Sequence, residues 1–98
     1  MSDGAGANPG PIKRSLAIAN KRGLHARAAA KFVRTAGQYD ASVRVGFKGQ
    51  EVSGLSIMGL MMLAAGIGTS IELICSGRQA MEAMVALSAL VEGKFGEE

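Results

Sequence analysis

The sequence predicts an α+β domain in which helices cover one face of a single four-stranded sheet. Two observations lead to this fold class. Hydrophobic residues recur at intervals of two in some segments and of three to four in others, and glycine-containing turns separate these segments. The chain has 98 residues, of which 48% are hydrophobic, so it can form one domain with a modest core. The expected element order is β-α-β-β-α-β-α.

The first half of the domain is expected to form a strand and a helix. Large and small side chains alternate over residues 15–19, which is typical of a strand. A polar turn over residues 20–23 leads into an alanine-rich helix that begins at Ala26 and ends at Gly37. The apolar face of this helix repeats every four residues: Leu24, Ala28, Phe32 and Ala36.

The second half continues with a hairpin and two helices. Strands over residues 42–47 and 50–53 flank a Lys-Gly turn, and Ser56 precedes an apolar helix over residues 57–65. A fourth strand is expected over residues 70–75. Apolar residues at helical spacing over 81–91 then predict a last helix, which ends near Gly93.

The ends of the chain differ from this core in composition. Residues 1–11 are rich in glycine, alanine and proline, which indicates a flexible tail. We therefore expect the domain to cover residues 12–93 and residues 94–98 to be frayed. The first residues do not have the pattern of a signal peptide, and the apolar run over 57–67 is too short to span a membrane. A monomeric cytoplasmic protein is expected.

Cysteine and histidine counts exclude several classes of protein. The chain has one cysteine and one histidine, so it forms no internal disulfide and no paired-histidine zinc site. We expect no metal and no cofactor. The net charge is +3, and seven of the eleven basic residues lie in a stretch that contains no acid. These are Lys13, Arg14, Lys21, Arg22, Arg27, Lys31 and Arg34. Such a stretch suggests an anionic partner: nucleic acid, an acidic protein face or phosphate.

The segment from Gly23 to Arg27 lies where a turn becomes a helix. The first N–H groups of a helix lack partners and carry a partial positive charge, so a phosphate placed there gains donors and a favourable field. The same field favours a neutral His25, whose free lone pair makes it a nucleophile. Arg27 could spread the charge of a transferred phosphoryl group. The pattern suits reversible phosphoryl capture on nitrogen, although a histidine at a helix start is more often a surface or capping residue.

The run Asn20-Lys21-Arg22-Gly23-Leu24-His25-Ala26-Arg27, followed by Ala28-Ala29-Ala30-Lys31-Phe32, resembles the active-site segment of the HPr family. These proteins are the histidine phosphocarriers of the phosphoenolpyruvate-dependent phosphotransferase system. The resemblance extends from Lys13 to Gly93, and the element order matches the family's open-faced β-sandwich with an antiparallel sheet. The Asn-Lys opening is similar to the nitrogen-related branch, NPr. One residue departs from the pattern: Ala28 replaces the usual proline of the first helical turn, which predicts a looser turn and no loss of chemistry.

The resemblance implies specific roles. His25 would carry the phosphoryl group on Nδ1 and Arg27 would stabilise it, with enzyme I as donor and a IIA-type protein as acceptor. Ser56 matches a regulatory serine, which HPr kinase/phosphorylase modifies in some lineages; from the residues alone it is first an N-cap. The residues after it match the docking surface for partner proteins: Ile57, Met58, Met61 and Met62. These four cannot all face inward on one short helix, so some must be exposed, as in interfaces that bind several partners.

Two other functions compete with a phosphocarrier. A nucleic-acid-binding module would explain the basic stretch, but aromatic residues are only 4% of the chain and offer no stacking platform. A regulatory protein-binding domain with an inert His25 is compatible with the same fold.

Overall fold

The computed structural model describes residues 10–97. It contains four strands, three α-helices and a short 3₁₀ turn, in the expected β-α-β-β-α-β-α order. The elements are β1 (Ile12–Ala17), α1 (Ala26–Ala36), β2 (Ser42–Phe47), β3 (Gln50–Ser53), α2 (Ile57–Met62), β4 (Ser70–Ser76), α3 (Ala80–Glu92) and the 3₁₀ turn η1 (Lys94–Gly96).

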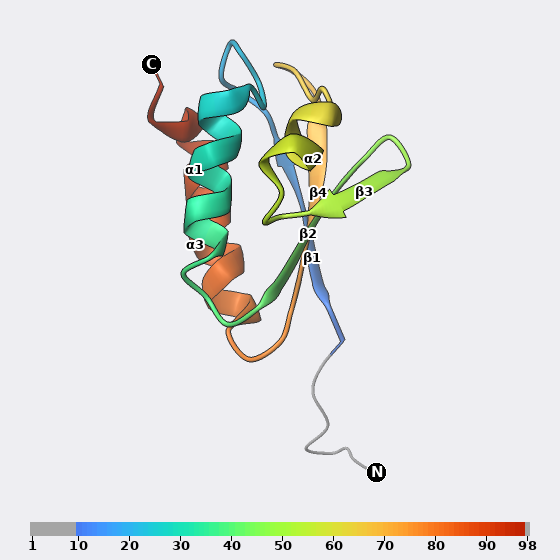
Figure 1. Ribbon diagram of the computed structural model, residues 1–98, viewed down its shortest axis with the longest axis vertical. Helices are drawn as coiled ribbons and strands as arrows, with labels where there is room; N and C mark the ends of the chain where they lie inside the picture. The colour runs from blue at the N-terminus through green and yellow to red at the C-terminus, as the bar shows by residue number, and fades with distance from the viewer. Residues whose placement is uncertain (1–9, 98) are drawn as a thin grey trace.

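The four strands form one antiparallel sheet in the order β1-β4-β2-β3. Strand β4 therefore lies in the interior of the sheet, although it is the last strand in the sequence. In Figure 1, α1 and α3 lie side by side on one side of the sheet, and α2 covers the part near β3. Buried and exposed residues alternate along β2 and β4, as expected for a sheet with one covered and one open face. The predicted fold class is confirmed.

Strand β1 begins three residues earlier than its own pattern predicts. Ile12 is paired with Cys75 and Lys13 with Ile74, so the ladder with β4 continues beyond the alternating segment. The strand ends at Ala17, although Ile18 is still buried with 1% exposure. The partner strand, not local alternation, sets these limits.

The second hairpin and the helix that follows it form largely as expected. Lys48 and Gly49 both have positive φ angles, 50° and 82°, which is the geometry of a two-residue hairpin turn. The helix predicted over residues 57–65 ends at Met62 instead. Ala64 adopts a left-handed φ of 58°, which stops the helix before the predicted end.

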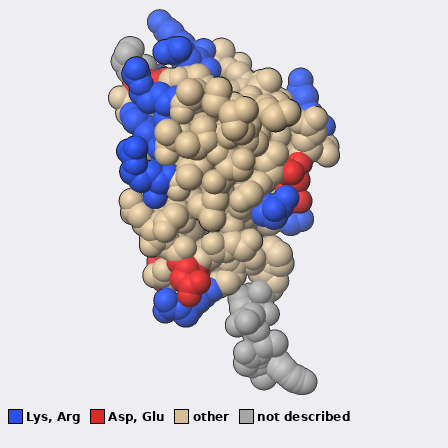
Figure 2. Space-filling view, in the orientation of Figure 1, with Lys and Arg blue, Asp and Glu red and all other residues tan. Residues whose placement is uncertain are grey.

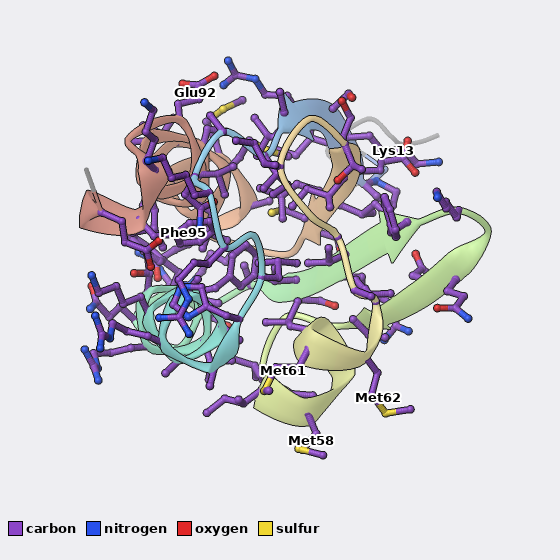
Figure 3. All side chains as sticks on the ribbon, turned by 90° about the horizontal axis from the view of Figure 1, so that it is seen from above. Lys13, Met58, Met61, Met62, Glu92 and Phe95 are labelled. Carbon is purple, nitrogen blue, oxygen red and sulfur yellow. The ribbon has the colours of Figure 1, made fainter. Side chains whose placement is uncertain are left out.

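The core lies between the sheet and the helices. It includes Leu73 from β4, Phe32 from α1, Leu60 from α2 and Leu87 from α3, all with 0% exposure. Phe95 is equally buried, and Figure 3 shows it between α1 and α3. The frayed end expected over 94–98 is therefore wrong for residues 94–97: an aromatic side chain docks this segment into the core. Glu98 and residues 1–9 of the predicted flexible tail lie outside the described residues.

Candidate functional site

A tight turn carries the chain from β1 to α1 and positions the site. The Asn20 carbonyl accepts a hydrogen bond from the Gly23 N–H at 3.2 Å, and the Asn20 side-chain amide donates to the Gly23 carbonyl at 2.9 Å. Asn20 is only 1% exposed, so this polar residue is a structural part of the turn. The Leu24 N–H then donates to the Ala65 carbonyl at 3.0 Å. The turn is thereby fixed to the segment that follows α2.

Gly23 is required in this turn for two independent reasons. Its φ of +63° lies in the left-handed region, where a side chain is strained. A Cβ at this position would also lie 2.4 Å from the Ala65 carbonyl oxygen, a distance at which the backbone must shift. The glycine thus allows the turn to approach residue 65 closely.

His25 is the N-cap residue of α1. Its backbone is extended, and its side chain makes no capping hydrogen bond. The first hydrogen bond of the helix runs from the Ala29 N–H to the His25 carbonyl at 2.9 Å. The N–H groups of the first turn therefore have no partners within the helix, and they lie at the same helix end as the imidazole. A phosphoryl group at this end would gain hydrogen-bond donors and a favourable helix field.

The His25 imidazole contacts an acid from the far end of the sequence. Its Nε2 lies 2.5 Å from the Glu97 Oε2, and the two side chains are 13% and 19% exposed. An ionised carboxylate only accepts hydrogen bonds, so Nε2 carries the proton in this pair. In the neutral ring, the lone pair is then on Nδ1. Sequence reasoning missed Glu97; the one available signal was Phe95, a large aromatic residue within the glycine-containing end.

Glu97 is itself held on both of its oxygens. The Asn20 amide nitrogen donates to the Glu97 Oε1 at 3.1 Å, in addition to its bond to Gly23. The hydrogen bond from His25 holds the pKa of Glu97 below its usual value of 4.5, and the bond from Asn20 and the charge of Lys31 act in the same direction, against a desolvation effect that raises it. The carboxylate is therefore ionised at neutral pH.

Cationic side chains surround this pair. A hollow of about 210 Å³ is lined by Lys21, Arg22, Arg27 and Glu97. Of these residues, Glu97 is the one that contacts His25. Figure 2 shows lysines and arginines gathered along the edge of the molecule where α1 lies. The two predicted site residues, His25 and Arg27, lie at the start of α1, and Arg27 lines a hollow whose three cations are opposite in charge to a phosphoryl group.

Ser56 is the N-cap of α2, as expected. Its hydroxyl oxygen accepts a hydrogen bond from the Gly59 N–H at 2.9 Å. The Ser56 side chain is half-buried. Position 59 has little room for a side chain, because a Cβ there would lie 3.0 Å from the Ser56 Oγ.

The four predicted docking residues on α2 are all exposed. The exposed fractions are 40% for Ile57, 66% for Met58, 37% for Met61 and 75% for Met62. Figure 3 shows Met58 and Met62 pointing away from the body of the protein. Leu55 and Ile67, which were not predicted, are exposed at 56% each just before and after this helix. We call these six residues the α2 surface. The bond from Leu24 to Ala65 fixes the His25 loop to the segment that leads from α2 to Ile67.

Comparison with known proteins identifies the family. The family described as "PTS HPr component phosphorylation site" matches residues 12–93. The chain belongs to the HPr family. A phosphocarrier protein HPr from Neisseria meningitidis is 54% identical over 86 residues, which cover 88% of this chain and 97% of the relative. A phosphocarrier protein NPr from Shewanella violacea is 41% identical over 86 residues, or 88% of this chain and 94% of that protein.

Solved structures agree with this assignment. HPr from Thermoanaerobacter tengcongensis has a TM-score of 0.85 at 41% identity, covering 89% of this chain and 98% of that one. A further structure, described as an HPr dimer from the same organism, has a TM-score of 0.71 at 43% identity and covers 84% of this chain and 94% of that one. The HPr family consists of phosphocarrier proteins of the phosphotransferase system, so this chain carries a phosphoryl group and is not an enzyme that turns over a free substrate.

The replacement of the usual proline by Ala28 does not change where α1 begins, and the looser first turn stays a prediction. Ala28 is 0% exposed in the core, and the helix begins at Ala26 as expected.

Within residues 10–97, no helix is long and apolar enough to cross a membrane. The same residues bring no three histidine, cysteine or acidic side chains together as candidate metal ligands.

Proposed function

We propose that His25 accepts a phosphoryl group on Nδ1 from phosphorylated enzyme I and passes it to a IIA-type protein. The observation that carries this proposal is the arrangement of the imidazole: Nε2 is engaged by Glu97, and Nδ1 is left with the lone pair beside the first turn of α1. A neutral imidazole with one free nitrogen is a competent nucleophile near neutral pH.

The transfer is balanced between two similar nitrogen atoms. The Nδ1 lone pair forms the new P–N bond while the P–N bond of the donor histidine breaks, and that electron pair returns to the donor ring. Transfer to the acceptor histidine repeats these changes with His25 as the donor. Because the bond formed is of the same kind as the bond broken, the specificity of the reaction depends on docking and in-line alignment.

Arg27 is proposed to stabilise the phosphoryl group during this exchange. It is exposed, it is in the first turn of α1 two residues after His25, and it lines the same hollow as Glu97. A planar guanidinium can donate two parallel hydrogen bonds to phosphoryl oxygens. Loss of one charged hydrogen-bond partner costs about 1.5–3 kcal/mol, which corresponds to roughly a 10- to 100-fold slower transfer.

The test is phosphorylation with phosphoenolpyruvate and enzyme I, measured by intact mass. One acid-labile, base-stable phosphoryl group is expected in the wild-type protein and none in His25→Ala. Arg27→Ala should slow incorporation, whereas Arg34→Ala, which removes the same charge from the last turn of the same helix, should not. If the wild-type protein accepts no phosphoryl group from any enzyme I of its source, the regulatory alternative with an inert His25 replaces this proposal.

The α2 surface is proposed to bind both partner proteins. Large apolar side chains exposed on and around one short helix have the composition of the centre of a protein interface. Met58→Ala and Met62→Ala should weaken enzyme I binding without changing the fold. Met81→Ala is a matched control, because Met81 is 60% exposed on α3, outside this surface.

Ser56 is proposed as a regulatory phosphorylation site at the edge of this surface. A phosphate there would add up to about two negative charges beside the docking residues and would repel an acidic partner. Ser56→Asp should keep the N-cap and weaken docking, whereas Ser42→Asp, an exposed position on β2, should leave docking unchanged. If both aspartate variants dock as well as the wild-type protein, Ser56 is a cap only.

The nitrogen-related role stays a prediction that rests on the Asn20-Lys21 opening. The relative named HPr is more similar to this chain than the one named NPr, at 54% against 41% identity, which weighs against it. Transfer from phosphorylated protein to purified sugar-type and nitrogen-type IIA proteins would distinguish the two roles. The monomeric state also stays a prediction, and sedimentation at micromolar concentration would test it.

A further inference from the structure

The C-terminal segment forms part of the wall of the His25 site. Phe95 is fully buried, and its carbonyl accepts a hydrogen bond from the Lys31 ammonium of α1 at 2.7 Å. Two residues later, Glu97 meets the imidazole of His25 and the amide of Asn20. The segment is thus attached to the domain at three points, and each of them contacts α1 or the turn before it.

We propose that Glu97 is the positioning residue for phosphoryl transfer: its carboxylate holds the proton of His25 on Nε2 and orients Nδ1 toward the incoming phosphorus. This inference rests on the function proposed above. It differs from that function because it assigns a task to a residue that lies 72 positions from the histidine and outside the matched region 12–93.

The charge change during transfer explains how Glu97 would act. When the Nδ1 lone pair bonds to phosphorus, the ring loses electron density and becomes a phosphoimidazolium with its proton still on Nε2. A carboxylate hydrogen-bonded to that N–H stabilises the developing positive charge, by the same principle as an acid that supports a catalytic histidine. No proton leaves the ring, so the step needs no external base. When the acceptor takes the phosphoryl group, the ring returns to the neutral tautomer with Nδ1 free.

The surrounding charges limit the cost of placing an acid beside a phosphoryl group. Lys21, Arg22 and Arg27 line the same hollow as Glu97, and the positive charge of Lys31 also acts on the carboxylate. These cations offset the repulsion between Glu97 and a phosphoryl group on Nδ1. The Glu97 carboxylate does not block phosphorylation, because it contacts Nε2 of His25 and leaves Nδ1, the proposed phosphoryl acceptor, free.

The site is built to keep Glu97 in one orientation. Asn20 is 1% exposed, and its amide donates to two acceptors, the Gly23 carbonyl and the Glu97 Oε1. Only the amide nitrogen can satisfy two acceptors, so the orientation of this side chain is determined. With the Oε1 held by Asn20, the Oε2 faces His25.

The first experiment compares single-turnover phosphorylation by enzyme I in wild-type, Glu97→Ala and Glu97→Gln proteins. The hydrogen-bond partners that orient metal-ligating histidines are typically worth about 10- to 100-fold, and we expect a similar factor here: Glu97→Ala should be slower by about that much with unchanged affinity for enzyme I. Glu97→Gln keeps an acceptor for the Nε2–H but has no charge, and its rate should lie between the other two. Glu92→Ala is the matched control, because Glu92 is an exposed acid that pairs with Arg14, and it should react like the wild-type protein.

A second measurement tests the proton position without any transfer. Nitrogen-15 NMR of the neutral imidazole should show the proton on Nε2 in the wild-type protein and a larger Nδ1–H fraction in Glu97→Ala. A wild-type ring protonated on Nδ1 would overturn the inference. So would equal or faster phosphorylation of Glu97→Ala, or a slowdown that Glu92→Ala shares. If the wild-type protein is not phosphorylated at all, the proposed function fails instead, and the NMR result still decides whether Glu97 sets the tautomer.

Discussion

Replacing Phe95 with alanine should destabilise the whole domain. Phe95 is 0% exposed and belongs to the same core as Phe32 and Leu87, although the sequence around it reads as a polar chain end. Removing a buried phenyl ring typically costs about 3–5 kcal/mol, which includes the cavity that it leaves. We expect the lower part of this range, because a terminal segment can relax more easily than a central one. This is still a large fraction of the roughly 5–15 kcal/mol that stabilises a typical domain.

Urea unfolding followed by far-ultraviolet circular dichroism measures this loss. A thermal scan gives a second measurement. At about 4–8 °C per kcal/mol for a domain of this size, a loss of about 3 kcal/mol should lower the melting temperature by at least roughly 12 °C. Val85→Ala is the control, because Val85 is 61% exposed on α3 and its removal should change the free energy of unfolding by no more than about 0.5 kcal/mol. A loss in Phe95→Ala below about 1 kcal/mol would refute the packing of this segment.

Three further predictions follow from local geometry. Gly23→Ala should cost more than about 1–2 kcal/mol in urea unfolding, because it adds a contact with the Ala65 carbonyl to the left-handed strain, whereas Gly49→Ala has open space and should show the strain alone; equal losses would contradict the close approach. Burial raises the pKa of the Cys75 thiol, so a thiol reagent at pH 8 should react only after unfolding, and rapid labelling of the native protein would contradict its position. Because the pKa of Glu97 is lowered in the folded state, its contribution to stability is present above pH 4.5 and is lost as the pH falls through the folded pKa. The melting temperature of Glu97→Gln should therefore lie below that of the wild-type protein at pH 7 and approach it in acid, and a constant difference would contradict the shift.

The parts of the site that were predictable depend on residues close together in the sequence. The turn and first helical residues around His25 are consecutive, so their pattern alone places the histidine at a helix start. The N-cap hydrogen bond of Ser56 spans three residues, and the hairpin turn at Lys48 and Gly49 spans two. Each of these features is set by backbone geometry and by neighbouring side chains.

The features that were missed depend on contacts between distant residues. Strand β1 starts at Ile12 because β4 offers a partner there, at Cys75, and nothing in the segment itself marks that start. The bonds from Lys31 to Phe95 and from His25 to Glu97 span 64 and 72 residues. Local composition around Phe95 is polar and rich in glycine, so only the folded core shows that this side chain has a place in it.

The loop that carries His25 is attached to parts of the chain that are far apart in sequence. Asn20 closes its own turn, Ala65 holds Leu24 from the segment after α2, and Glu97 reaches the imidazole from beyond α3. No single element of the protein contains all of these contacts, so the His25 side chain acquires its geometry only when the complete domain has folded. The geometry proposed for phosphoryl transfer is thus tied to the fold as a whole: a partly unfolded molecule keeps the His25 side chain but loses the contacts that orient it.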